Sequence, residues 1–182
     1  MFETFTSHNP LPEMYELYEL ARKDPKNRLP QNYTEDRAFT HDTLLYSVTL
    51  EDGRPILGSS LIMKDFYNKS ARALNRLYLV PGTSAMMPRK LVHKLYPPIA
   101  EQLRQQVEKA KSHNITDIFI SRDDKHTGRM NRLIYAFNHN TPYDWTLTDE
   151  EYWTCKDKCQ ECSQRIFYIN NLTLTRNEDV VF

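Results

Sequence analysis

The sequence has little glycine and no excess of charge of either sign. Only four of its 182 residues are glycine, and it contains neither G-x-x-x-x-G-K-[ST] nor G-x-G-x-x-G, the loops that cradle nucleotide phosphates. Its 24 basic residues balance its 24 acidic ones, which argues against bulk attraction to nucleic acid. A nucleic-acid partner would need a local basic patch, and we disfavour one built from Arg89, Lys90, Lys94 and Arg104.

Long apolar runs are also absent. No run is long enough to span a bilayer, and the first ten residues, MFETFTSHNP, lack the basic start and the apolar stretch of a signal peptide. We therefore expect a cytoplasmic protein with no membrane partner. The length is typical of one domain, and no linker or repeat interrupts the sequence, so we predict a single domain over residues 1–182.

The only three cysteines lie in one octet, CKDKCQEC, at residues 155–162. Their C-x3-C-x2-C spacing matches the cluster ligands of radical SAM enzymes, but too little chain follows to form the barrel that such enzymes need. Cys155, Cys159 and Cys162 could bind zinc only with a fourth ligand, and the octet holds no histidine. We expect reduced thiols and no metal. A zinc site and a disulfide between Cys155 and Cys162 stay open as alternatives.

The first strong element signal is a helix over residues 11–21. Its apolar residues recur at helical spacing: Met14, Leu17, Tyr18 and Ala21. Residues 22–40 are polar, aperiodic and broken by proline. We interpret them as a long loop with at most one short helical turn.

Three strands are predicted next, at residues 44–50, 56–63 and 71–80, each rich in strand-forming residues. The Asp52-Gly53 pair between the first two is a strong hairpin signal. The second and third are joined by a short polar turn, KDFYNKS. The pattern therefore predicts an antiparallel meander.

A helical stretch follows the third strand, and Pro97-Pro98 is expected to divide it into two pieces. The first piece is short and basic and runs through Lys94. The second carries one apolar stripe: Ile99, Leu103, Val107 and Ala110. A buried strand over residues 115–121 comes directly after it, and strand, helix and strand in this order predict a right-handed parallel crossover.

The chain is predicted to close with a helix over residues 130–138 and two strands near 145–154 and 164–170, with the cysteine octet at the turn between them. The fold class is thus α/β (α+β). We predict a mixed, mostly antiparallel central sheet with one parallel strand–helix–strand crossover, flanked by helices.

This order of elements, over about residues 10–171, resembles the fold of the GNAT (Gcn5-related N-acetyltransferase) superfamily. Leu77-Tyr-Leu-Val-Pro81 looks like the family's fourth strand running out to V-x-P. The Ile-Ala-Glu-Gln-Leu to Asp-Ile-Phe-Ile unit looks like the helix and strand that follow it. The resemblance implies that an acyl-CoA thioester lies between strands 71–80 and 115–121, which splay apart, and that its pantetheine arm pairs with strand backbone.

The sequence departs from the family where the pyrophosphate of coenzyme A would bind, because it lacks the [RQ]-x-x-G-x-[GA] loop. The resemblance implies an altered site at the start of the long helix, where main-chain N–H groups and the helix dipole favour an anion. Its candidate residues are Leu79, Val80, Gly82, Thr83, Ser84, Arg89 and Lys90. A solvated first turn capped by Thr83 or Ser84 is the alternative.

Catalysis in this family needs an acid that reprotonates the departing thiolate. Tyr135, in Leu133-Ile-Tyr135-Ala-Phe137, is similar to the tyrosine that does this in the family's next helix. Packing on a helix face is the alternative role for this ring. The base is open: Asp65, Glu51 and His93 are candidates, and a water relay would also serve.

The resemblance implies an N-acyltransferase that moves an acyl group from acetyl-CoA or another acyl-CoA to an amine of a small molecule or peptide. We expect the acceptor pocket to be lined by the loop over residues 22–40 and by aromatic residues: Tyr33, Tyr135, Tyr143 and Trp145. The alternative is a GNAT-like protein without catalysis that binds a protein partner. A homodimer is compatible with both.

Overall fold

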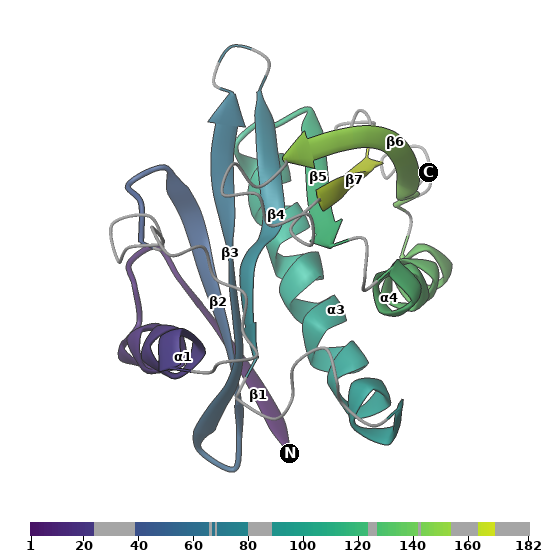
Figure 1. Ribbon diagram of the computed structural model, residues 1–182. Helices are drawn as coiled ribbons and strands as arrows, with labels where there is room; N and C mark the ends of the chain where they lie inside the picture. The colour runs from purple at the N-terminus through teal and green to yellow at the C-terminus, as the bar shows by residue number, and fades with distance from the viewer. Residues whose placement is uncertain are drawn as a thin grey trace, which may run out of the picture. The chain divides into compact units, whose positions relative to one another are not determined.

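The computed structural model describes residues 1–23, 39–65, 67, 69–79, 89–123, 127–141, 143–153 and 164–169 (Figure 1). The chain forms two compact units. Unit 1 comprises Met1–Ile62 and Ala73–Lys109, and unit 2 comprises Met63–Arg72 and Ala110–Phe182. The strands form one hydrogen-bonded sheet in the order β1-β2-β3-β4-β5-β7-β6.

The predicted meander consists of β2 (Thr43–Glu51), β3 (Arg54–Asp65) and β4 (Ser70–Leu79), of which the stretch from Met63 to Arg72 belongs to unit 2 and the rest to unit 1. β2 pairs antiparallel with β3, and Glu51 opposes Arg54, so that Asp52 and Gly53 form a two-residue turn. Their φ angles are 50° and 78°, as the Asp-Gly pair predicts. The meander prediction is therefore confirmed.

One strand was not predicted from the sequence: β1 (Phe2–Ser7), which pairs antiparallel with β2 from Phe2 opposite Glu51 to Ser7 opposite Tyr46. No residue of β1 is fully buried. An edge strand of this kind lacks the strong apolar alternation by which strands are recognised. When β1 is counted, β4 is the fourth strand of this chain. It is also the strand that resembles the fourth strand of the GNAT family.

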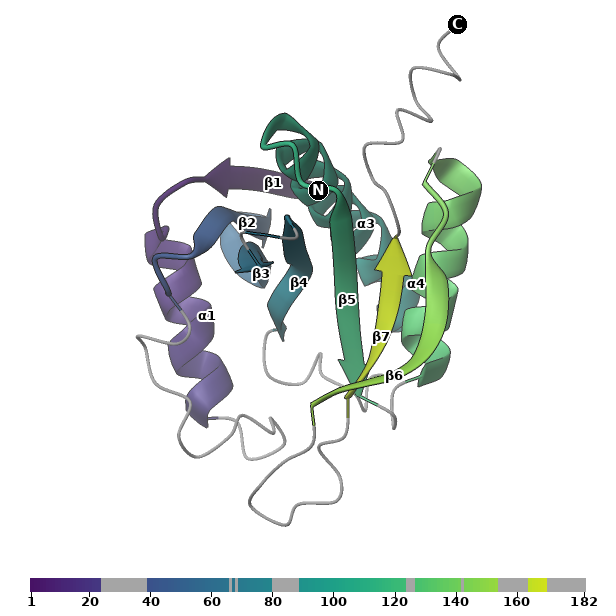
Figure 2. The same ribbon diagram turned by 90° about the horizontal axis from the view of Figure 1, so that it is seen from above.

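Two helices cover opposite faces of the unit 1 strands (Figure 2). α1 (Pro12–Lys23) buries its predicted apolar side against β2, in a cluster that includes Met14, Leu17 and Val48. The contact is close at Gly58, where an added Cβ would lie 2.7 Å from Met14 Sδ. α3 (Arg89–Ser112) packs on the other face through the stripe that the sequence predicts.

α3 is one continuous helix, so the prediction that Pro97 and Pro98 divide it is wrong. Each proline removes a main-chain hydrogen-bond donor and crowds the preceding turn. Leu95 and Ile99 are nevertheless both buried, one on each side of the pair. Burial of the same helix face before and after the prolines offsets the lost hydrogen bonds.

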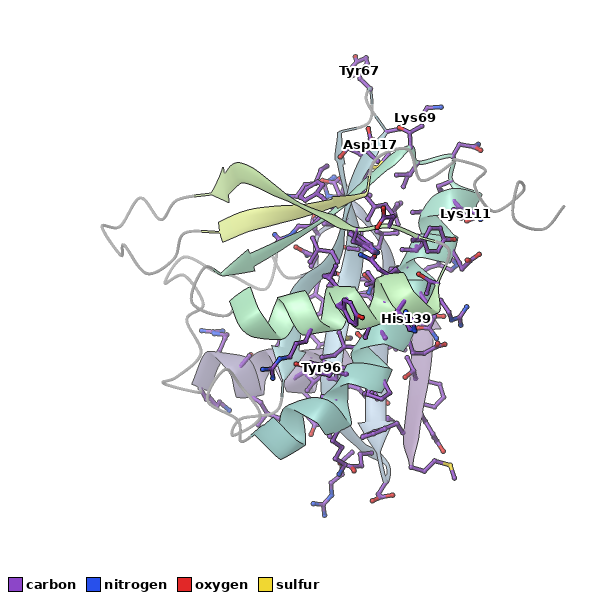
Figure 3. All side chains as sticks on the ribbon, turned by 90° about the vertical axis from the view of Figure 1, so that its right-hand side faces the viewer. Tyr67, Lys69, Tyr96, Lys111, Asp117 and His139 are labelled. Carbon is purple, nitrogen blue, oxygen red and sulfur yellow. The ribbon has the colours of Figure 1, made fainter. Side chains whose placement is uncertain are left out.

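In unit 2, residues 70–72 at the start of β4 pair in parallel with residues 117–119 of β5 (Asp117–Asp123). The Lys69 carbonyl also accepts the main-chain N–H groups of Thr116 at 3.0 Å and Asp117 at 3.3 Å. Figure 3 shows Lys69 and Asp117 at the same end of the structure. The predicted parallel crossover is therefore confirmed.

The rest of unit 2 follows the predicted order. α4 (Thr127–Asn140) comes after β5, and β7 (Gln164–Ile169) pairs antiparallel with both β5 and β6 (Thr146–Trp153). The fold class predicted from the sequence, a mixed sheet with one parallel crossover and flanking helices, is confirmed. Within the described ranges, no helix is long and apolar enough to cross a membrane.

Candidate functional site

The residues expected to bind coenzyme A lie between the end of β4 and the start of α3. Leu79 is the last residue of β4, and Arg89 and Lys90 are the first two of α3. The others expected there, at positions 80 and 82–84, fall outside the described residues. The first turn of α3 contains no acidic residue. No carboxylate in this turn therefore neutralises the positive end of the helix dipole. An anion site at a helix start requires that this end stays positive.

Two basic residues farther along α3 already have acidic partners. Lys94 forms an ion pair with Glu51 and lies 5.7 Å from the centre of the Phe2 ring. Arg104 donates two hydrogen bonds to the Glu101 carboxylate, at 2.6 Å and 2.9 Å. Lys94 and Arg104 thus each have an acidic partner within unit 1.

β4 contains a residue in an unusual main-chain conformation. Leu74 is buried and has a φ of +48°, in the left-handed region that bulky residues other than glycine rarely adopt. Such a conformation costs about 1–3 kcal/mol and persists only where the surrounding structure enforces it. Leu74 lies two residues beyond the parallel pairs with β5, in the part of β4 that belongs to unit 1.

The main chain of Leu74 is contacted by a side chain of α3. The Leu74 N–H donates to Gln106 Oε1 at 2.7 Å. On the other side of the same amide, Gln106 Nε2 donates to Ser59 Oγ at 2.8 Å and to Ser47 Oγ at 3.2 Å. Gln106 is fully buried, so one side chain joins α3 to β2, β3 and β4.

A second fully buried glutamine lies one helical turn earlier. Gln102 Nε2 donates to Thr49 Oγ1 at 2.9 Å and to the Leu57 carbonyl at 3.3 Å, and Gln102 Oε1 accepts from Ser59 Oγ at 2.6 Å. This network was not predicted from the sequence. A sequence pattern that could have indicated it is the pair of glutamines at i and i+4 beside the apolar stripe of α3. The strands that these glutamines face have serine and threonine at alternate positions.

None of the three base candidates is established by its surroundings. Glu51 is held in the ion pair with Lys94 at the end of β2. Asp65 ends β3 and His93 lies in the first half of α3, and the side chains of both fall outside the described part of the structure. Asn75 is a buried polar residue on β4, and its Nδ2 donates to Ser60 Oγ at 3.2 Å.

Tyr135, the expected acid, lies on α4 with 74% of its surface exposed. Its ring stacks on that of His139, with centroids 6.3 Å apart and planes 3° from parallel. Figure 3 shows His139 on the same helix. The hydroxyl of Tyr135 is therefore not committed to a buried core, and an incoming molecule can reach this side chain.

The other aromatic residues expected around the acceptor have a different environment. Tyr143 and Trp145 are buried and lie about the Phe137 ring, with centroids 6.1 Å and 5.9 Å away. The side chain of Asn138 bonds both the N–H and the carbonyl of Trp145. Tyr143 and Trp145 thus pack between α4 and the start of β6, and their expected place around the acceptor stays a prediction. Tyr33 lies outside the described residues.

The cysteine octet falls between β6 and β7, outside the described residues, so its predicted state stays a prediction. In the part of the chain that the structure describes, no group of three or more histidine, cysteine, aspartate or glutamate side chains could hold a metal ion.

No family model matches the sequence, and no curated protein matches it. Solved structures do match. Diaminobutyrate acetyltransferase of Paenibacillus lautus, in complex with L-2,4-diaminobutyric acid and coenzyme A, has a TM-score of 0.62 at 12% identity over 94% of this chain and 97% of its own. An N-acetyltransferase of Staphylococcus aureus Mu50 has a TM-score of 0.61 at 12% identity, over 94% and 98%.

A further match is a GNAT-family acetyltransferase from the same S. aureus strain, with a TM-score of 0.57 at 15% identity over 93% of this chain and 99% of its own. At such identities a likeness of structure establishes the fold alone. The order of elements, the parallel crossover through α3 and these matches agree. The chain has a GNAT-like fold.

Proposed function

We propose that this protein is an N-acyltransferase that transfers the acyl group of acetyl-CoA or another acyl-CoA to an amine of a small molecule or peptide. The observation that carries the proposal is the GNAT-like fold over nearly the whole chain, shared with acetyltransferases that include one in complex with coenzyme A. The exposed Tyr135 adds support, because it lies on α4, the helix on which the resemblance implies an acid.

The proposed roles follow from the elements that carry the residues. The start of α3, with Arg89 and Lys90, binds the pyrophosphate, and the main chain of β4 binds the pantetheine arm. The acceptor amine attacks the thioester carbonyl carbon, and the carbon–sulfur bond breaks. The Tyr135 hydroxyl gives its proton to the departing thiolate, while a base or a water molecule takes the proton of the amine.

Calorimetric titration with acetyl-CoA and longer acyl-CoAs tests the binding step. We expect a dissociation constant in the micromolar range, weakened about tenfold or more by the double variant Arg89→Gln/Lys90→Gln. The matched control is Arg22→Gln/Lys23→Gln, which removes the same charge from the last turn of α1 and should leave the affinity within about twofold. Failure of every thioester to bind would overturn the proposal.

The transfer step needs its own test, because the missing glycine loop favours a second candidate, a GNAT-like protein that binds a partner without catalysis. A panel of amines is incubated with acetyl-CoA, and released coenzyme A is measured by chromatography, since the three cysteines would react with thiol dyes. We expect one amine class to stimulate release, and Tyr135→Phe to lower kcat by about 10²-fold or more with unchanged acetyl-CoA affinity. Binding without release across the panel would favour the second candidate.

A further inference from the structure

The buried network attached to β4 has no part in the chemistry proposed above. We propose that Gln106 is a positioning residue for acyl-CoA binding. Its side-chain amide holds Leu74 in the left-handed conformation, and this sets the direction in which residues 75–79 present their main-chain groups to the pantetheine arm. The inference rests on the proposed function, in which that arm pairs with β4.

The amide of Gln106 has one orientation that satisfies its neighbours. The Leu74 N–H can only donate, so it requires the oxygen Oε1, and Nε2 then faces the hydroxyl oxygens of Ser47 and Ser59. A flipped amide would set two donors against each other. Because Gln106 is fully buried, loss of Oε1 would leave the Leu74 N–H with no acceptor from bulk water.

Leu74 depends on this contact because its own side chain offers nothing to stabilise a positive φ. Asparagine can form local hydrogen bonds in this conformation and glycine has no Cβ to clash, but leucine has neither advantage. A leucine released from Gln106 would relax toward an extended conformation. A change of this kind at one residue bends the strand that follows it.

Asn75, the residue after Leu74, is held by contacts of its own. The side chain of Asn75 is fixed to β3 through Ser60 Oγ, and the same hydroxyl lies 3.4 Å from the Asn75 carbonyl. Leu74 is thus the unusual residue immediately before a strand position that is already anchored. The direction of residues 75–79 depends on both contacts, and only the contact to Leu74 comes from α3.

The chain supplies a matched control. Gln102 lies on the same helix, is equally buried and has as many partners as Gln106, but those partners are on β2 and β3. Replacing either glutamine by methionine keeps the chain length and the helix propensity and leaves buried polar groups unpaired. The two variants should lose comparable stability, whereas only Gln106→Met loses the contact with β4.

The first experiment is calorimetric titration of acetyl-CoA into the full chain and its variants, at a temperature where circular dichroism shows each to be folded. We expect Gln106→Met to weaken binding about tenfold or more and Gln102→Met to stay within about twofold of wild type. Equal weakening by both variants would overturn the inference while the proposed function stands. No binding by the wild type would instead overturn the proposed function.

A second substitution at Leu74 tests whether Gln106 acts by positioning β4 or only by packing in the core. In the Gln106→Met background, Leu74→Gly should recover most of the lost affinity, because glycine adopts a positive φ without support. Leu74→Ala removes nearly the same side chain but keeps the steric penalty, so it should not recover affinity. Equal affinities for the glycine and alanine double variants would contradict the proposed role.

If Gln106→Met does not fold, hydrogen exchange on the wild-type protein still tests the inference. The Leu74 amide should be strongly protected before any ligand is added, because it is buried and bonded to Gln106. Acetyl-CoA should then raise protection at residues 75–79. Fast exchange at Leu74 in the free protein, or unchanged exchange at residues 75–79 with ligand bound, would overturn the proposal.

Discussion

The two faces of β2 present different side chains to the two helices that cover them. Toward α1, β2 presents Tyr46 and Val48, which join an apolar cluster. Toward α3, the alternate residues Ser47 and Thr49 accept hydrogen bonds from glutamine. Because successive residues of a strand point to opposite faces, one short sequence carries both patterns.

α1 and α3 are therefore held on the strands in different ways. Contact with α1 depends on volume, and Gly58 makes room for Met14 and Leu17, whose atoms would lie 2.7 Å and 2.9 Å from an added Cβ. Contact with α3 depends on direction as well, because each amide of Gln102 and Gln106 bonds named atoms on the strands. Packing on the apolar face of β2 supplies stability. The hydrogen bonds on its polar face also fix how α3 is aligned with the strands, and Gln106 alone extends them to β4.

The largest expected effect is on the apolar face. Leu17 is fully buried, and Leu17→Ala should lower the free energy of unfolding by about 2–5 kcal/mol, because it leaves a cavity. Leu17→Met nearly conserves volume and should cost less than about 1.5 kcal/mol. Urea unfolding followed by circular dichroism measures both. Equal losses for the two variants would show that this face is not governed by volume.

The polar face should behave differently. Gln102→Met nearly conserves volume as well, yet it should cost about 1–3 kcal/mol, because Thr49, Ser59 and the Leu57 carbonyl lose a buried partner. A double-mutant cycle with Thr49→Val should give a coupling energy of at least about 0.5 kcal/mol. If the two losses simply add, the hydrogen bond between Gln102 and Thr49 is not a stabilising contact.

The smallest effect is expected at Glu101 on the partly exposed side of α3. The hydrogen bond from Arg104 lowers the pKa of Glu101 below its ordinary value. A lowered folded-state pKa stabilises the protein above the unfolded pKa, and this is lost as pH falls through the folded pKa. Glu101→Gln should therefore cost about 0.3 kcal/mol at neutral pH and nothing in strong acid. Urea midpoints at both pH values measure this, and a difference that persists in acid would contradict it.

Much of the fold could be predicted because its elements have strong local signals. The Asp-Gly hairpin and the apolar stripe of α3 depend on residues close in sequence, and both are confirmed. β1 lacked such a signal because it is a partly exposed edge strand. The continuity of α3 through Pro97 and Pro98 depends on burial on both sides of the prolines, which a local rule for proline does not include.

The candidate site was harder to predict. Tyr135 and the start of α3 followed from the resemblance to a family, not from chemistry evident in the residues themselves. The left-handed conformation of Leu74 could not be predicted, because leucine disfavours it and its support, Gln106, lies 32 positions away in the sequence. The burial of Tyr143 and Trp145 likewise depends on packing against Phe137.

One measurement tests the central claim that this fold binds acyl-CoA along β4: an amide-resolved NMR titration of the isotope-labelled protein with acetyl-CoA. We expect saturable shift changes at residues 75–79 and in the first turn of α3, with little change at residues 14–21 of α1. Unchanged amide shifts along β4 at millimolar acetyl-CoA, or changes centred on α1, would contradict it.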